Sequence, residues 1–223
     1  SAINFNHEAT NDDGSCMYPE LNLTIAEIQG MQEESPYLGQ MVTTTGLVVA
    51  ISESAYFLQS EVGAWNGVYV YSTNDSLEVG NQISITAIVS EFSGATQMSD
   101  VNSITILSSE FTNLSTTISA AMLNTEAYEG VLVTVDTLKC IAEANNYGEA
   151  EFAGATDTII SDDMFLDFSP TLGAYYKARY VYSTIVPALS ATKHAYESSY
   201  TSKAACLAGE YEYEYEYEYE YEY

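Results

Sequence analysis

Residues 40–51 read Gln-Met-Val-Thr-Thr-Thr-Gly-Leu-Val-Val-Ala-Ile, a run of β-branched and apolar side chains that predicts a β-strand. Turn-forming residues recur downstream, at Trp65-Asn66-Gly67, at residues 72–75, at Val79-Gly80-Asn81 and at residues 92–94. The segments between these turns predict further strands at residues 55–59, 67–71, 82–92 and 101–107. Upstream, residues 21–29 indicate a strand or a single helical turn. About five or six short strands so closely spaced predict a small barrel or sandwich.

The same pattern occurs a second time along the chain. The run Tyr37-Leu38-Gly39-Gln40-Met41-Val42-Thr43 matches Tyr128-Glu129-Gly130-Val131-Leu132-Val133-Thr134, 91 residues later. Leu77-Glu78-Val79-Gly80 matches Pro170-Thr171-Leu172-Gly173, 93 residues later. Matching anchors at a nearly constant offset predict two copies of one domain, joined near residues 109–117. The second copy should have strands at residues 130–141, 149–153, 157–161, 174–184 and 185–188, while residues 191–208 fit a capping helix or another strand.

The last fourteen residues, 210–223, alternate Glu and Tyr without interruption. This is the period of a strand, so one face would carry only tyrosines, namely Tyr211, Tyr213, Tyr215, Tyr217, Tyr219, Tyr221 and Tyr223. No turn follows, so we expect the segment to pair with an exposed sheet edge, in the same chain or in the next subunit. Pairing with the next subunit would give an open head-to-tail polymer. A solvated acidic tail and an engineered sequence stay open as alternatives.

The charge of the chain excludes several classes of partner. The 223 residues include 32 acidic side chains against five basic ones, which gives a formal net charge of −27. Nucleic acids and anionic membrane surfaces both attract cationic proteins, so we expect neither as a partner. No apolar run reaches the ~18 residues of a membrane-spanning helix, which argues against membrane insertion. The absence of a signal peptide indicates a mature or truncated product.

Three cysteines are present, Cys16, Cys140 and Cys206, and their odd number leaves at least one without an intramolecular partner. Cys140 lies on a predicted strand, and we expect it to pair with Cys206, near the end of the same domain. Three buried free thiols are the alternative.

The sequence offers no catalytic motif. Neither His7 nor His194 lies in a nucleophile motif, and no Gly-rich phosphate loop, Cys-x-x-Cys or His-Glu-x-x-His pattern occurs. We therefore expect a protein that is not an enzyme. Trp65, Tyr69 and Tyr71 fit an aromatic surface for carbohydrate as well as ordinary packing or subunit contact.

The first copy resembles the OB-fold modules of secreted bacterial surface proteins and extracellular nucleases. The resemblance rests on Ile25-Ala26-Glu27-Ile28-Gln29-Gly30, Ser35-Pro36, Gly39-Gln40, residues 42–49, Tyr56-Phe57-Leu58-Gln59, Gly67-Val68-Tyr69-Val70-Tyr71 and residues 79–92. Residues 128–135 and 170–182 resemble the companion module more weakly. Asn81 stands where this family has Asp, and the basic groove of a nucleic-acid-binding OB fold is missing. The resemblance implies an extracellular, all-β protein with two tandem small OB-like β-barrels and a C-terminal extended strand, without nuclease activity.

Residues 2–16 resemble the calcium segments of large Bacteroidota surface proteins, which are similar to thrombospondin type 3 repeats. Asn4, Asn6, Asp12 and Asp13 offer the hard oxygen ligands that Ca²⁺ prefers, and Gly14 permits a tight bend. An ordinary Asx-turn loop explains the same residues, so both interpretations stay open. The leading Cys-Thr-Asp of the family is missing, so the family partner of Cys16 is not in this chain.

Three segments fit the Asp-Ser/Thr-apolar signal that Bacteroidota use for O-glycosylation. The acceptor residues would be Ser76, Thr137 and Thr158. Asn-x-Ser/Thr sequons occur at Asn22, Asn74 and Asn113, and such tripeptides also arise by chance.

Together these patterns predict four parts: an Asx-rich calcium-type loop at residues 1–19, OB-like domains at 20–110 and 111–209, and a tail strand at 210–223. We expect an extracellular structural protein of the cell surface that assembles with itself head to tail into a filament by strand addition. The alternative is a non-catalytic module that binds glycan or protein, as part of a larger secreted enzyme or adhesin.

Overall fold

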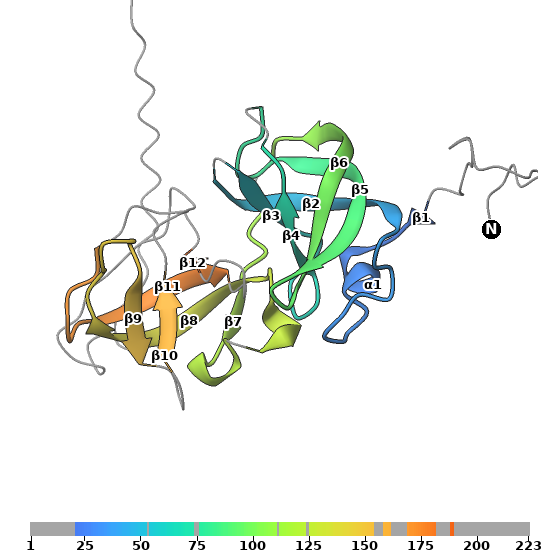
Figure 1. Ribbon diagram of the computed structural model, residues 1–223. Coiled ribbons are helices and arrows are strands. Elements are labelled where there is room, and N and C mark those ends of the chain that lie inside the picture. Colours follow the sequence, from blue (N-terminus) through green and yellow to red (C-terminus); the bar gives the residue numbers. More distant parts are fainter. Residues whose placement is uncertain are drawn as a thin grey trace, which may run out of the picture.

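The computed structural model describes residues 21–52, 54–73, 76–110, 112–123, 125–153, 158–161, 169–181 and 188–189, with backbone alone at 136, 161, 177–181 and 188–189. The first part of the chain forms β1 (Leu21–Asn22), α1 (Ile25–Gln29), β2 (Met41–Ile51), β3 (Ala55–Gln59), β4 (Gly67–Tyr71), β5 (Gln82–Phe92) and β6 (Ala95–Ser108). The second part forms β7 (Thr116–Ile118), η1 (Ala120–Met122), η2 (Glu126–Tyr128), β8 (Leu132–Ala142), β9 (Ala150–Ala153), β10 (Thr158–Ser161), β11 (Tyr175–Val181) and β12 (Ala188–Leu189). Figure 1 shows the two parts as neighbouring lobes.

The first sheet closes on itself. Its strand order is β1-β2-β3-β4-β6-β5, and β2 also pairs with β5, so five strands form a ring. The pairing of β4 with β6 is parallel, whereas the other pairings in the ring are antiparallel. A five-stranded Greek-key ring with this order has the topology of an OB fold. The all-β, OB-like fold predicted from the sequence is therefore confirmed for this sheet.

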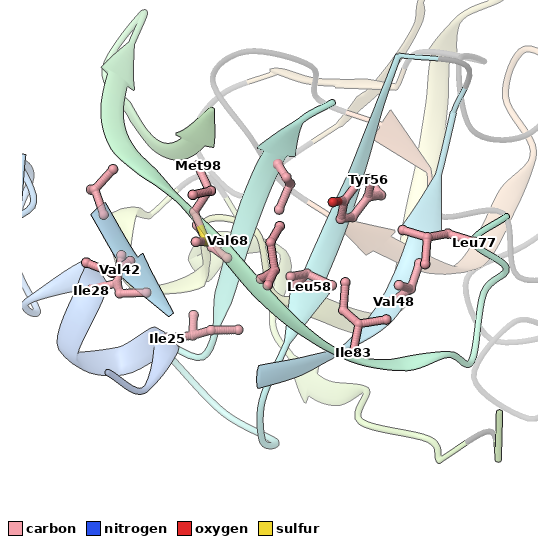
Figure 2. Close-up of a cluster of buried hydrophobic side chains, with 14 residues drawn as sticks. Ile25, Ile28, Val42, Val48, Tyr56, Leu58, Val68, Leu77, Ile83 and Met98 are labelled. Carbon is pink, nitrogen blue, oxygen red and sulfur yellow. The ribbon is translucent and has the colours of Figure 1, made fainter. Parts of the chain in front are cut away.

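Alternation along the strands fills the interior of the ring. In β5 every second residue is buried, and these are Ile83, Ile85, Ala87 and Val89. Figure 2 shows that side chains from α1 and the surrounding strands gather around the same centre. The period of two in the sequence therefore identifies the core-facing residues of β5 correctly.

A short helix closes one end of the ring. Thr24 caps α1: its side chain accepts the backbone N–H of Glu27, and the Glu27 carboxylate accepts the backbone N–H of Thr24. Gly30 ends the helix in the left-handed conformation, with φ of 68°. Ile25 and Ile28 are fully buried in the core of the ring. Residues 21–29 thus contain both a two-residue strand and a helical turn.

Within the described residues, the second sheet repeats the pairings of the first except the β4–β6 pairing, so it is not closed into a ring. Its order is β10-β9-β8-β11-β12, and β7 pairs with β8 in parallel, as β1 pairs with β2. Strand β8 lies between β9 and β11, just as β2 lies between β3 and β5. The strands next to β8 therefore correspond to those next to β2, as the matching anchors in the sequence suggest.

The repeat extends to single hydrogen bonds. The N–H of Gly80 donates to the carbonyl of Val48 over 2.9 Å, and the N–H of Gly173 donates to that of Cys140 over 2.8 Å. Both glycines have positive φ, 99° and 83°. A register shift follows Val48 in β2 and Cys140 in β8, so both long strands carry a bulge at the same place.

Several predicted boundaries differ from the structure. β6 begins at Ala95 rather than at residue 101, because Ser93 and Gly94 both have positive φ and form a tight hairpin turn. The short helices η1 and η2 were not predicted. Strand β12 begins at Ala188, where the predicted last strand ends. Residues 191–208 and the predicted tail strand lie outside the described residues.

Candidate functional site

An apolar face on the outside of the first sheet meets the second lobe. Leu47 and Val49 of β2, Phe57 of β3 and Tyr69 of β4 form what we call the acceptor face. Their neighbours along these strands point into the ring, so β2, β3 and β4 are apolar on both sides. Phe57 and Tyr69 contact each other edge to face, with ring centroids 5.1 Å apart.

Two segments of the second lobe cover the acceptor face. Leu132, at the start of β8, is buried in the same cluster as the acceptor face, and Leu114 packs against it. We call residues 127–132 the docking segment. The contact therefore joins the outside of the first sheet to the beginning of the second one.

The side-chain amide of Gln59 joins the two lobes by hydrogen bonds. Its Oε1 accepts the backbone N–H of Leu132 over 2.8 Å, and its Nε2 donates to the carbonyls of Leu114 and Glu61 over 2.9 and 2.8 Å. Gln59 is fully buried, so these bonds replace the water that its amide loses. One side chain thus holds both segments that cover the acceptor face.

Two glycines let the backbones of the lobes touch. A Cβ on Gly67 would lie 2.1 Å from the carbonyl carbon of Gly130, a distance that no real side chain tolerates. Gly130 also has φ of 68°, which favours glycine. Only glycine fits at Gly67 without a shift of the docking segment.

The connection between β3 and β4 adds two backbone contacts. The N–H of Trp65 donates to the carbonyl of Ala127 over 2.7 Å, and the N–H of Gly63 donates to the hydroxyl of Thr116 over the same distance. Trp65 has φ of 68°, an uncommon conformation for a bulky residue. The residue in this uncommon conformation is thus the one whose N–H bonds to the second lobe.

The acceptor face occupies the place where OB folds bind ligands. The usual ligand face lies on the second and third strands of the ring, which here are β3 and β4. Tyr69 is buried on this face against Phe57, whereas Tyr71 is exposed. The aromatic side chain of Tyr69 thus packs between the lobes rather than forming an open carbohydrate surface.

Carboxylates gather beside the junction. The backbone N–H of Ser35 donates to Glu91 over 3.0 Å, and the hydroxyl of Thr96 donates to the same carboxylate. Burial raises the pKa of Glu126, and the negative charges of Glu91 and Glu33 raise it further. Among the described residues, no group of three or more His, Cys, Asp or Glu side chains could hold a metal ion.

Many predicted site residues lie outside the described part of the chain. These are the calcium ligands Asn4, Asn6, Asp12 and Asp13, the cysteine Cys206, and the tyrosines of residues 210–223. Cys140 is a buried thiol on β8, and its Sγ contacts the carbonyl oxygen of Ala142 over 3.3 Å. Burial raises the pKa of this thiol, and Glu143 adds to the effect. Its pairing with Cys206 stays a prediction.

The predicted glycosylation residues differ in accessibility. Ser76 and Thr158 are exposed, the first between β4 and β5 and the second at the start of β10. Thr137 lies within β8 and is half-buried, with a buried hydroxyl oxygen. Ser76 and Thr158 are thus more accessible than Thr137, and glycosylation of all three stays a prediction.

A second surface feature is the far edge of β6. Up to Met98 this strand lies between β4 and β5, but from Ser103 to Ser108 it pairs only with β5 within the described residues. This stretch, Ser-Ile-Thr-Ile-Leu-Ser, has neither charge nor proline, and Ile106 and Leu107 are exposed. Native proteins usually protect such edges with charges or proline.

The sequence contained the junction residues but not their role. Gln59, Gly67 and Gly130 all lie in the motifs that carry the OB resemblance or the internal repeat. A usable signal was the uninterrupted apolar run of residues 55–58, which is typical of a strand covered on both faces. A polar Gln59 directly after such a run points to a specific buried partner.

Comparisons with known proteins add little to this geometry. No family model and no curated protein matches the chain. One solved structure, described as "Structural mimicry for functional antagonism", is 13% identical with a TM-score of 0.33, and the match covers 72% of this chain and 93% of that one. Another, "Crystal structure of the tetrameric p202 HIN2", is 10% identical with a TM-score of 0.32, and the match covers 73% of this chain and 95% of that one.

Within the described residues no helix is long and apolar enough to cross a membrane.

Proposed function

We propose that the chain is an extracellular, non-enzymatic structural protein and the subunit of a head-to-tail filament. In this proposal residues 210–223 of one copy add as a strand to an exposed sheet edge of the next copy. Backbone hydrogen bonds would supply the strength of the contact, and the tyrosine face would supply its register.

The observation that carries the proposal is the edge from Ser103 to Ser108. An uncharged, proline-free edge that includes the β-branched residues Ile104, Thr105 and Ile106 pairs readily with another strand. The tail has the matching property, because its period of two belongs to a strand. An unprotected edge and a strand-like tail in one chain are complementary parts of an open polymer.

The covered acceptor face supports a structural role in a second way. Leu132 and Leu114 occupy the surface that an OB-fold binding module would offer to its ligand. Burial of that surface within the chain favours the filament over the alternative of a glycan-binding or protein-binding module for the first lobe.

Three further expectations belong to the same proposal. Calcium would stiffen the loop of residues 1–19, glycans on Ser76 and Thr158 would coat the exposed surface, and the Cys140–Cys206 disulfide would tie down the end of the second lobe. Each suits an extracellular location at a bacterial surface.

The test compares the full chain with a chain that ends at Gly209, using sedimentation at matched concentrations. We expect the full chain to form large assemblies and the truncated chain to stay monomeric and folded. A matched control replaces the seven tail tyrosines by serine, which keeps all seven negative charges and removes the aromatic face. This tyrosine-free variant should also stay monomeric. If the truncated chain assembles as well as the full chain, strand addition by the tail is overturned. A monomer that binds a polysaccharide would instead support the binding module.

A further inference from the structure

The junction within one chain joins two unlike surfaces, the acceptor face of the first sheet and the docking segment of the second. Because the two sheets are structural repeats, each chain contains both kinds of surface twice. One pair is used inside the chain. The other pair consists of a second acceptor face, on the second sheet, and a second docking segment, at the start of the first sheet.

Strand pairing identifies the second acceptor face. Ala50 pairs with Phe57 and Phe57 with Tyr69 in the first sheet, and Ala142 pairs with Glu151 and Glu151 with Ile160 in the second. The bulge places Ile141 where the first sheet has Val49. The second acceptor face therefore consists of Ile141 and Ile160, with the charged side chains of Lys139 and Glu151 where the first sheet has Leu47 and Phe57.

The repeated motif identifies the second docking segment. Met41 at the start of β2 corresponds to Leu132 at the start of β8, and Gly39 corresponds to Gly130. Both glycines have positive φ, 75° and 68°. A Cβ on Gly39 would meet no atom within 4 Å, whereas one on Gly130 would meet the backbone of Gly67. The second docking segment, residues 36–41, is thus open where the first one is covered.

The first acceptor face and docking segment are buried against each other, whereas their counterparts are partly exposed to solvent. Val49 is 1% exposed and Tyr69 5%, whereas Ile141 and Ile160 are each 42% exposed. Leu132 is 1% exposed, whereas Met41 is 48% exposed. In Figure 1, β9 and β10 lie at one end of the molecule and β1, which pairs with the start of β2, lies at the other. Partly exposed apolar side chains therefore occur on both lobes, Ile141 and Ile160 on the second and Met41 on the first.

We propose that the second acceptor face of one copy receives the docking segment around Met41 of the next copy, repeating the contact made inside each chain. The partner is a second copy of this protein. The contact joins unlike surfaces, so it does not close a dimer but continues from copy to copy. This inference deepens the proposed filament and rests on it: the face contact sets the orientation of neighbours, and the tail strand holds them.

The contact between copies would be weaker than the junction inside the chain. Strand pairing places Ala153 where the first sheet has Gln59, and Thr158 where it has Gly67. The amide that holds Leu132 therefore has no counterpart, and the close backbone approach of Gly67 and Gly130 cannot recur. A contact of this kind needs a second connection, which is the role that the tail would have.

The test introduces one carboxylate into each surface of the full chain, with a control elsewhere. Ile160→Glu alters the second acceptor face and Met41→Glu the second docking segment. The control is Met122→Glu, in η1, a residue 42% exposed like Ile160 and part of neither surface. We expect each surface variant to raise the critical concentration for assembly at least about tenfold, because Met41→Glu would bring a carboxylate into the contact and Ile160→Glu would add a second one beside Glu151. The control should assemble like the unaltered chain.

Mixing the two variants distinguishes unlike surfaces from like ones. The Ile160→Glu chain keeps its docking segment and the Met41→Glu chain keeps its acceptor face, so an equimolar mixture should form one-to-one complexes at concentrations where neither variant alone associates. Unchanged assembly of both single variants would overturn the face contact while leaving the filament and its tail intact. Failure of the unaltered chain to assemble at all would instead overturn the proposed function, and the inference with it.

Discussion

The side-chain Oε1 of Gln59 accepts the backbone N–H of Leu132 across 73 residues of sequence, and this bond fixes the start of the second sheet on the outside of the first. The same amide donates to the carbonyl of Leu114. The two OB-like lobes are thereby joined by a buried, directional contact in addition to their apolar surfaces. In the proposed filament, force would pass between the lobes partly through this bond.

Replacing Gln59 by Ala should destabilise the protein by about 1–3 kcal/mol, because the N–H of Leu132 would remain buried without an acceptor. Urea unfolding measures the change, and the two lobes should also unfold less cooperatively. Gln32→Ala is the matched control, since that amide donates to the carbonyl of Glu34 at the surface. Its effect should stay within about 0.5 kcal/mol. Equal effects of the two substitutions would contradict the role of Gln59.

Gly130→Ala should cost more stability than Gly39→Ala, although both glycines have positive φ and occupy equivalent places in the repeat. Backbone strain alone predicts a loss of about 1–2 kcal/mol at either position. At Gly130 the new Cβ would also lie 2.9 Å from the carbonyl carbon of Gly67, so the junction must open. Thermal unfolding of both variants decides the matter, and indistinguishable melting temperatures would mean that the lobes do not touch there.

Gly67→Ala provides an independent check of the same contact. This position needs no left-handed backbone, so the effect comes from the clash with Gly130 alone. We expect separation of the lobes while the first sheet stays folded. Small-angle scattering should show a more extended molecule, with unchanged circular dichroism. A compact Gly67→Ala variant with unaltered stability would contradict the close approach.

Glu126 should make the stability of the junction depend on pH. Its pKa is raised in the folded protein by burial, and then by Glu91 and Glu33. A group with a raised folded pKa contributes stability below its unfolded pKa and loses that contribution as the pH rises through the folded value. The Glu126→Gln variant should therefore be about as stable as the unaltered protein near pH 4. Towards about pH 7 it should become the more stable of the two.

Glu33→Gln tests the cause of that shift. Glu33→Gln removes one of the two neighbouring charges. In that background, the stability difference at neutral pH between the protein with Glu126 and the Glu126→Gln variant should become smaller. Urea midpoints measured across this range report both effects. A difference that grows towards acid instead would show that the Glu126 carboxylate is stabilised in its charged form.

The fold was predictable because its signals are local. Alternation in residues 82–92, the turn at Ser93-Gly94 and the glycines before β2 and β8 each require only a few neighbouring residues. The internal repeat added the second sheet, since Gly80 and Gly173 mark equivalent hydrogen bonds. Such patterns predict strands and the turns between them, whereas the pairings of β2 with β5 and of β4 with β6 join distant segments and were not predicted.

The junction was not predicted because its partners are distant in the chain. Gln59 and Leu132, or Gly67 and Gly130, meet only after both sheets exist. The residues of β2, β3 and β4 are apolar on both faces, so their sequence does not say which side faces the ring and which side faces the other lobe. The predicted calcium, disulfide and tail residues depend in turn on parts of the chain outside the described residues.

Negative-stain electron microscopy of the full chain, beside the chain that ends at Gly209, tests the central claim most directly. The account predicts regular filaments from the full chain and dispersed particles from the shorter one. A calcium chelator should shorten or fray the filaments if residues 1–19 bind the ion. Dispersed monomers of the full chain, or filaments of equal length from both chains, would contradict assembly through the tail.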